Sequence, residues 1–282
     1  MPGTLFVVAT PIGNLEDITA RALRILREVA LIAAEDTRRT GHLLARYAIS
    51  TPSTSLHEHN EATKTRSIIA RLQQGASVAL VSDAGTPTIS DPGQRLIRSA
   101  IDANVRVEAI PGPSAALAAL AASGIPSDTF TFLGFPPIKA NDRRKWLMDL
   151  CSAGRTVVFF EAPHRIRTTL NQIQAIAGDR TVVVARELTK AYEELVRGPI
   201  SGVLDRLRNP RGEMTIVIDI GQTPDLGSTC PVDDDRLFAE FGELTLNSAL
   251  SRRRAINLVA RRHHLPANQV YDAIERAKKS TE

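Results

Sequence analysis

The stretch from Ser77 to Ile97 constrains the fold of this chain more than any other. It opens with Val78–Val81, and so short an apolar run, bounded by polar residues, predicts a strand buried on both faces. It closes with Asp91 and Pro92, which predict a helix start, because Asp accepts backbone N–H bonds at an N-cap and Pro suits the first turn. A strand, a loop and a helix in this order are typical of α/β folds, which bind ligands at the carboxyl ends of parallel strands.

The loop in this stretch, Ser82–Ser90, carries side chains that suit some ligands better than others. Asp83 follows the strand directly, the loop contains no lysine, and the chain has no glycine-rich phosphate-binding motif. Phosphate sites use free N–H groups and positive charge. The loop therefore favours a ligand with hydroxyl groups and positive charge. The alternative is a turn whose Asp and Thr side chains bind only their own backbone, and the loop alone does not decide between the two.

Other apolar runs extend the pattern into two αβα domains. After an alanine-rich helix the pattern restarts near Pro126, and two short connections between the later strands predict a mixed second sheet. A segment rich in Gly, Pro, Ser and Thr then resembles a linker, and the rest is helical. We therefore expect an α/β fold with four parts: an N-terminal αβα domain over 1–122, a second αβα domain over 123–220, a linker over 221–232 and a helical tail over 233–282.

The tail contains two short helices joined by a tight turn, which resembles a helix-turn-helix. Arg252, Arg253 and Arg254 lie on the first of them, and a further basic cluster, 261–264, follows. One interpretation is that this basic surface docks nucleic acid. The other is a small dimerisation or capping bundle with a solvated basic face, which the residues alone favour because no aromatic side chains are interleaved with the arginines.

Composition narrows the class of protein. The chain has only two cysteines, far apart and without metal-ligand spacing, which fits a reducing compartment. His57 and His59 are two residues apart, but no further ligands complete a metal site, and we expect no metal. The N-terminus has no signal-peptide pattern and no apolar stretch is long enough to span a bilayer, so we expect a cytoplasmic protein without membrane partners.

Seven motifs carry a resemblance to a known family. In chain order they are Thr10–Asp17, Glu35–Thr40, Ser55–Glu61, Ser82–Gly93, Pro111–Ala115, Phe160–Arg165 and Arg186–Lys190. With these motifs the chain resembles the tetrapyrrole methylase superfamily and, within it, the family that methylates the RNA of the small ribosomal subunit. The resemblance extends from the N-terminus to about Ile220, and we see no departure within the motifs.

The resemblance implies the fold of a class III S-adenosylmethionine methyltransferase, in which two αβα domains enclose the cofactor and the chain forms a homodimer. The implied reaction is 2′-O-methylation of a cytidine in the decoding region of 16S rRNA, so that the partner is the small ribosomal subunit. A donor with a sulfonium cation and no phosphate suits a loop that carries Asp83 and no lysine. The residues expected to bind the cofactor are Pro11, Gly13, Asp83, Gly85, Thr86, Pro87, Pro111, Ser114 and Ala115.

The chemistry of that reaction suggests further site residues. In-line methyl transfer needs the hydroxyl oxygen held near the methyl carbon, and a carboxylate or neutral His helps by taking the hydroxyl proton. The candidates for this role, which the sequence does not rank, are Asp36, His57, Glu61 and Glu161. Asp36 is the preferred one, because its neighbours can hold RNA phosphates. The residues expected to contact RNA are Arg38, Arg39, Arg165, Arg252, Arg253 and Arg254.

Two other functions stay open beside this one. The same fold also methylates small tetrapyrrole substrates, which predicts a large apolar trough, whereas the polar clusters at 35–40 and 57–61 and the basic tail favour RNA. A non-catalytic RNA-binding assembly factor would depend on the tail alone and would not need the cofactor.

Overall fold

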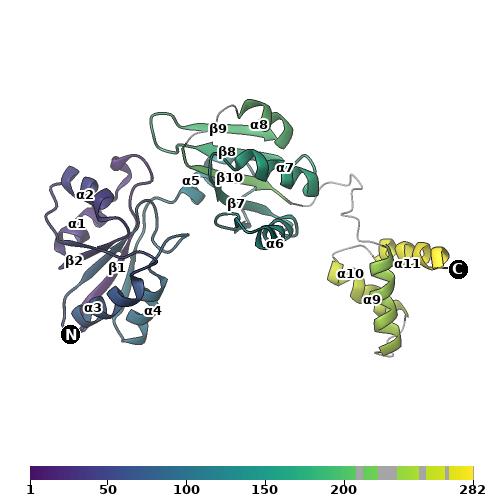
Figure 1. Ribbon diagram of the computed structural model, residues 1–282, viewed down its shortest axis with the longest axis horizontal. Coiled ribbons are helices and arrows are strands. Elements are labelled where there is room, and N and C mark those ends of the chain that lie inside the picture. The colour runs from purple at the N-terminus through teal and green to yellow at the C-terminus, as the bar shows by residue number, and fades with distance from the viewer. Residues whose placement is uncertain (208–211, 222–233, 248–251, 264–266, 282) are drawn as a thin grey trace. The chain divides into compact units, whose positions relative to one another are not determined.

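The computed structural model describes residues 1–207, 212–221, 234–247, 252–263 and 267–281 (Figure 1). They form two compact units, Met1–Gln222 and Thr223–Glu282, and the boundary lies in the segment expected to be a linker. The first unit contains two five-stranded sheets, and the second contains three helices. The expected helical segment at the C-terminal end of the fold is therefore confirmed.

The first sheet is parallel throughout, with the strand order β3-β2-β4-β1-β5. All four residues of both β2 and β4 are buried, as expected of strands covered on both faces. The strands are β1 (Thr4–Val8), β2 (Leu31–Ala34), β3 (Ser53–Ser55), β4 (Val78–Val81) and β5 (Arg106–Ile110). The helices of this part are η1 (Leu15–Asp17), α1 (Ala20–Glu28), α2 (Thr37–Arg46), α3 (Glu61–Gln73), α4 (Gln94–Asp102) and α5 (Ala115–Ser123).

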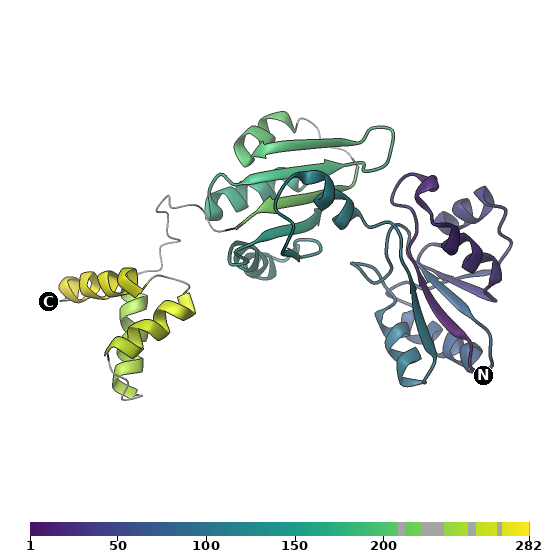
Figure 2. The ribbon, with the colours of Figure 1, turned by 180° about the vertical axis from the view of Figure 1, so that it is seen from behind.

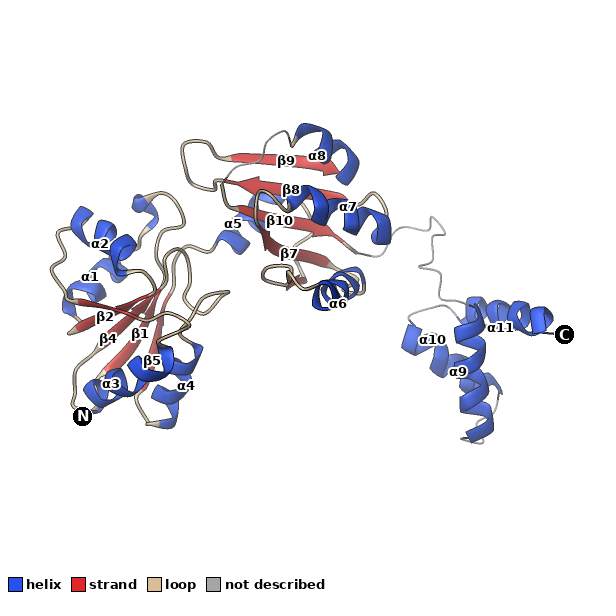
Figure 3. Ribbon diagram, viewed as in Figure 1, coloured by secondary structure: helices blue, strands red, loops and turns tan. Residues whose placement is uncertain are grey.

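Alternation along the strands builds one core on each face of this sheet. On β2, Ile32 and Ala34 pack with α1 and α2, whereas Leu31 and Ala33 pack with α3 and α4 (Figure 3). The sheet is thus a middle layer between two helical layers. Its parallel strands bring the ends of β1, β2 and β4, and the loops that follow them, to one edge.

The second sheet is mixed, as the sequence predicts, with the order β6-β7-β10-β8-β9. Only the pair β6 and β7 is parallel, and the other neighbours are antiparallel. The strands are β6 (Phe130–Phe132), β7 (Thr156–Glu161), β8 (Thr181–Arg186), β9 (Glu194–Pro199) and β10 (Met214–Asp219). Three helices cover one face with a large apolar core: α6 (Ala140–Cys151), α7 (Ile166–Ala177) and α8 (Ile200–Arg206).

Helix α5 covers the other face of the second sheet, although it follows the last strand of the first. Its Ala116, Ala119 and Leu120 pack against residues of β7, β8 and β10, including Val158 and Val217 (Figure 2). The small side chains let the helix lie close to the sheet. The expected N-terminal domain, 1–122, thus includes a helix whose packing partners lie in the second sheet.

The start of α4 differs from the sequence prediction. The helix begins at Gln94 with Gly93 as its N-cap residue, so the prediction of Asp91 as N-cap and Pro92 in the first turn is wrong. Gly93 has a φ of +123° and a Cβ there would lie 2.7 Å from Leu80 Cδ2, so both conformation and space require glycine. The chain between Ser82 and Gly93 therefore lies outside the helix and forms the loop between β4 and α4.

The second unit is a three-helix bundle with its own apolar core. The helices are α9 (Asp234–Asn247), α10 (Arg252–His263) and α11 (Ala267–Thr281). Leu237, Val259 and Val270 contribute one buried side chain each from the three helices. Among the described residues, no helix is long and apolar enough to cross a bilayer.

Candidate active site

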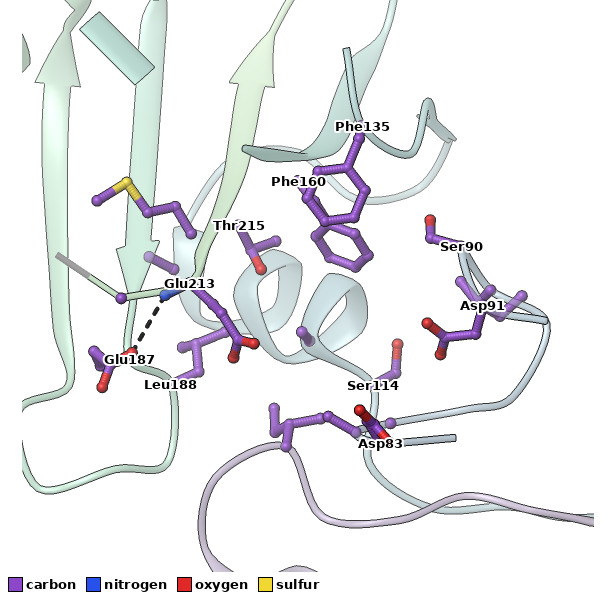
Figure 4. A pocket seen from close by; sticks show the side chains of 18 of the residues that line it. Asp83, Ser90, Asp91, Ser114, Phe135, Phe160, Glu187, Leu188, Glu213 and Thr215 are labelled. Atoms are coloured by element: carbon purple, nitrogen blue, oxygen red, sulfur yellow. Dashed lines mark hydrogen bonds between the residues drawn. The ribbon is translucent and has the colours of Figure 1, made fainter. Parts of the chain in front are cut away.

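A pocket of about 420 Å³ lies in the first unit, between loops of the first sheet and the ends of strands of the second. Figure 4 shows the carboxylates of Asp83 and Asp91 on one side of the pocket and the aromatic side chains of Phe135 and Phe160 on another. We call the side formed by Glu35, Arg39, 83–86, 89–91 and the start of α5 the first wall. The side formed by Phe135, 160–163, 185–190 and 212–215 is the second wall.

The expected ligand loop, Ser82–Ser90, is held against the end of β1. Thr10 and Gly85 exchange two backbone hydrogen bonds, of 2.9 and 3.0 Å between N and O, and Gly85 has a φ of +80°. The hydroxyl of Thr86 donates to the carbonyl oxygen of Pro113 at 3.3 Å, which joins the loop to the turn before α5. Five of the residues expected to bind the cofactor line the pocket: Asp83, Gly85, Thr86, Ser114 and Ala115.

The other four residues expected to bind the cofactor are not among the pocket-lining residues: Pro11, Gly13, Pro87 and Pro111. Gly13 instead lies where two loops meet. A Cβ on Gly13 would lie 2.6 Å from Lys190 Cγ and 2.7 Å from the carbonyl oxygen of Leu188, and the next residue, Asn14, donates its N–H to Thr189 Oγ1 at 3.0 Å. The loop after β1 therefore contacts the turn after β8.

Three carboxylates gather on the first wall. Asp83 Oδ1 accepts the N–H of Asp36 at 2.9 Å, Asp83 Oδ2 lies 3.4 Å from Arg39, and the Asp83 N–H donates to Glu35 at 3.4 Å. Burial raises the pKa of Glu35. Burial, together with the negative charge of Glu35, raises the pKa of Asp91 to about 6. The sequence analysis did not identify Asp91 or Glu35 as site residues.

Three of the four candidate proton acceptors have structural partners and do not line the pocket. Asp36 caps α2, and its hydrogen bonds with Arg38 lower the pKa of Asp36 to about 2. His57 Nε2 lies 3.0 Å from Asn60 Nδ2, in the turn before α3. Glu61 accepts the N–H groups of Arg95 at 3.0 Å and of Leu96 at 3.4 Å, so it caps α4 from the neighbouring helix.

The fourth candidate, Glu161, lies at the edge of the pocket and is 1% exposed. Its oxygens lie 3.3 Å from Arg165 Nε and 4.0 Å from Arg143, and the Thr169 hydroxyl donates to it. Arg165 also donates to the carbonyl oxygen of Pro136 at 2.5 Å. These contacts hold Glu161 as part of a buried ion-pair network that fixes the loop after β6.

That loop brings an aromatic side chain to the second wall. Phe135 is 55% exposed, and its ring centroid lies 5.3 Å from that of Phe160. An exposed aromatic ring that lines a pocket and is supported by a second, partly buried ring is suited to stacking against a planar ring of a ligand. The sequence signal for it is the phenylalanine beside the pair Pro136 and Pro137, a residue that the sequence analysis did not single out.

The arginines expected to contact RNA lie in several places. Arg39 lines the pocket, Arg38 is largely exposed and Arg165 belongs to the buried network. In the second unit, Arg252 pairs with Glu275 and lies 5.6 Å above the ring of Tyr271. Arg254 is exposed, and the side chain of Arg253 lies outside the described residues.

Comparisons with known proteins identify relatives of the whole chain. The family model "Tetrapyrrole (Corrin/Porphyrin) Methylases" matches residues 4–203. A Synechocystis protein named "Ribosomal RNA small subunit methyltransferase I" is 43% identical over 272 residues, which cover 95% of this chain and 96% of the relative. Proteins of the same name from Escherichia coli O157:H7 and Pseudomonas aeruginosa are 43% and 48% identical, over 95% and 79% of this chain and 93% and 81% of theirs.

Solved structures show the same fold at low sequence identity. Diphthine synthase gives a TM-score of 0.63 at 14% identity, covering 77% of this chain and 90% of its own. A cobalt precorrin-4 methyltransferase gives 0.58 at 19% identity, covering 77% and 94%. A Thermus thermophilus uroporphyrin-III C-methyltransferase complexed with S-adenyl homocysteine gives 0.55 at 16% identity, covering 77% and 98%.

Proposed function

The chain belongs to the tetrapyrrole (corrin/porphyrin) methylase family, and from this we propose that it transfers a methyl group from S-adenosylmethionine to the RNA of the small ribosomal subunit. The observation that carries the proposal is the set of relatives named for this activity, which are 42–50% identical to the chain over most of its length. The acceptor we propose is the 2′-hydroxyl of a cytidine in the decoding region of 16S rRNA, as the motifs imply.

The pocket supports S-adenosylmethionine as the methyl donor. Its volume of about 420 Å³ lies within the usual range of cofactor sites. The carboxylates of Glu35 and Asp83 line one part of it and favour a cationic ligand. When bound, S-adenosylmethionine supplies a methyl group on a positively charged sulfur. Gly85, Thr86, Ser114 and Ala115 are the remaining residues that we propose to hold it.

The residues around the mouth of the pocket suit a polyanionic acceptor. Arg38 lies on α2 with its side chain 88% exposed, close in sequence to the pocket-lining Arg39. Guanidinium groups in such places bind phosphates and thereby position the RNA. We propose the same role for Arg165 and for the tail arginines Arg252, Arg253 and Arg254, of which Arg254 has its side chain exposed.

The experiment that tests the proposal uses small ribosomal subunits that lack this methylation. They are incubated with the protein and labelled S-adenosylmethionine, and the RNA is then digested to nucleosides and separated. We expect the label in 2′-O-methylcytidine. Label in another nucleoside would overturn the proposed acceptor. No label in RNA, although calorimetry shows cofactor binding, would overturn the RNA substrate and favour a small molecule.

The small-molecule alternative has its own support in the fold, because the cobalt precorrin and uroporphyrin methyltransferases share it. Against it stands the difference in similarity, because the relatives named for the RNA of the small ribosomal subunit are 42–50% identical to this chain, whereas these two enzymes are 19% and 16% identical. A competition assay with a uroporphyrinogen-type acceptor separates the two functions. We expect no transfer to the macrocycle under conditions in which the ribosomal RNA is labelled.

We further propose that the protein acts as a cytoplasmic homodimer. The proposed cytoplasmic location follows from the proposed substrate, the small ribosomal subunit. The proposed dimer follows from the family resemblance. Light scattering coupled to gel filtration tests the oligomeric state of the full chain. A mass near 61 kDa is expected from twice the 30.6 kDa of one chain, and a mass near that of one chain would overturn the dimer.

A further inference from the structure

Asp91 lacks the structural role that its sequence position suggests. The N-terminal N–H groups of α4 are satisfied from outside the loop, because Glu61 accepts those of Arg95 and Leu96 at 3.0 and 3.4 Å. The helix begins only at Gln94. Asp91 therefore does not cap α4. The capping carboxylate is that of Glu61, the first residue of α3.

The loop that carries Asp91 turns its side chain into the pocket. Thr88 and Ser90 adopt left-handed conformations with φ of +72° and +69°, which non-glycine residues seldom do. These turns redirect the chain between Pro87 and α4. Figure 4 shows the carboxylates of Asp83 and Asp91 pointing toward the same part of the pocket, with Phe135 and Phe160 beyond them.

The charged groups around Asp91 differ in the hydrogen bonds and ion pairs that they form. From the first sheet, Asp83 is held by Asp36 N–H and Arg39, and Glu35 accepts the N–H of Asp83. Among the described residues no ion pair involves Asp91, and an interaction with the side chain of Ser82 only partly offsets the rise in the pKa of Asp91. On the second wall, Lys190 lies 3.0 Å from Glu187 and 3.4 Å from Glu213, so that cation is already paired. Of the three carboxylates of the first wall, Asp91 therefore forms the fewest hydrogen bonds and ion pairs.

From this arrangement we propose that Asp91 is the proton acceptor of the methyl transfer. The inference rests on the proposed function and names the catalytic group within it. The acceptor hydroxyl oxygen forms the new bond to the methyl carbon, the bond from that carbon to sulfur breaks with its electron pair on sulfur, and the hydroxyl proton passes to an Asp91 carboxylate oxygen. A carboxylate with a raised pKa is a stronger base than an ordinary one and is still ionised at neutral pH.

The experiment compares Asp91→Asn with the wild type in the full chain, at pH 7.5, on unmodified small ribosomal subunits. Asn keeps the size of the side chain but cannot take the proton. We expect kcat to fall by about 100-fold or more. The dissociation constant of S-adenosylmethionine, measured by calorimetry, is expected to stay within about threefold, and the thermal midpoint is expected not to fall. Asp91→Glu should restore part of the rate.

A matched control is Asp102→Asn, at the other end of α4. Asp102 is paired with Arg98 at 3.1 Å on the exposed side of the helix and does not line the pocket. We expect it to leave both kcat and cofactor affinity unchanged.

Two outcomes would overturn the assignment of Asp91 while leaving the proposed function intact. One is a kcat of Asp91→Asn within threefold of the wild type. The other is a loss of cofactor affinity as large as the loss of rate, which would make Asp91 a ligand-holding residue. A wild type that binds the cofactor but labels no RNA is a different result, because the proposed function then fails and this inference fails with it.

Discussion

The two walls of the pocket use charge in opposite ways. The first wall has three carboxylates, those of Glu35, Asp83 and Asp91, but only one guanidinium among its lining residues. This is Arg39, which pairs with Asp83. On the second wall, each described carboxylate lies within ion-pair distance of at least one cation. Glu161 has Arg143 and Arg165, and Lys190 lies near both Glu187 and Glu213.

This difference separates structure from function. Paired charges inside a protein hold segments in place, and removing one partner leaves the other uncompensated. Carboxylates that are buried next to each other have raised pKa values, as Glu35 and Asp91 do, and such groups gather at functional sites. We therefore infer that the ion pairs of the second wall hold its segments in place. The first wall, in contrast, attracts the cationic cofactor and takes up the hydroxyl proton.

The largest expected effect is on the second wall. Glu161→Ala removes the common partner of Arg143 and Arg165, whose side chains are only 12% and 22% exposed. We expect a loss of about 3–5 kcal/mol in the free energy of unfolding, measured by chemical denaturation. The control Glu28→Ala breaks an exposed pair with Arg24 and should cost about 0.5 kcal/mol at most. Equal losses in the two variants would contradict the supporting role of the second wall.

A second prediction concerns the contact between the loop after β1 and the turn after β8. In Gly13→Ala the new methyl would lie 2.7 Å from the Leu188 carbonyl oxygen and 2.6 Å from Lys190 Cγ, and the backbone oxygen cannot simply move aside. We expect a loss of about 1–3 kcal/mol in unfolding free energy and weaker cofactor binding. In Gly41→Ala, within α2, a Cβ meets nothing within 4 Å, so that substitution should stabilise the protein by up to about 1 kcal/mol. The opposite order of the two would show that the loops do not depend on this contact.

A third prediction concerns the charge of the first wall. Asp83→Ala removes one of its three carboxylates, and we expect affinity for the cationic cofactor to fall about tenfold, or about 1.4 kcal/mol, with the fold intact. Calorimetry with S-adenosylmethionine measures the affinity, and circular dichroism checks the fold. Unchanged affinity would show that the first wall does not attract the cofactor through this charge.

The smallest expected effect is on the pH dependence of stability. Because the pKa of Asp91 is raised to about 6 in the folded protein, its ionised form destabilises the fold at higher pH. Its contribution is fully favourable below the unfolded pKa near 3.8 and is lost as the pH rises through about 6. Asp91→Asn should therefore be more stable than the wild type by about 1 kcal/mol at pH 7.5, allowing for solvent screening, and equal to it near pH 3.5. A variant less stable than the wild type at pH 7.5 would indicate a structural role.

The sequence predicted the α/β fold and the mixed second sheet because strand runs and short connections are local signals. The loop alone left a ligand site and a self-bonded turn open, and the family resemblance assigned Asp83, Gly85 and Thr86 to cofactor binding; the structure shows them lining the pocket. The predicted cap of α4 was wrong. Local spacing makes Asp91 the natural cap of α4, but the cap is Glu61, which is 34 residues away from Arg95 in the chain. No local pattern contains such a long-range exchange.

For a related reason, the sequence could not predict which carboxylates of each wall form ion pairs. Glu161 is followed by Arg165 four residues later, which is a visible pair, but Arg143 reaches Glu161 only through the packing of α6 against α7. Conversely, Glu35 and Asp91 come from loops that follow different strands and meet only at the sheet edge. Whether a carboxylate is paired or left free depends on these tertiary contacts.

The pH dependence of methyl transfer to unmodified small ribosomal subunits tests the central claim most directly. The account predicts label in 2′-O-methylcytidine and a kcat/KM that falls as the pH drops below about 6, where Asp91 takes up a proton. In Glu35→Gln this fall should move to lower pH, because removing the neighbouring negative charge lowers the pKa of Asp91. A profile without a fall near pH 6, or one that Glu35→Gln leaves in place, would contradict the account.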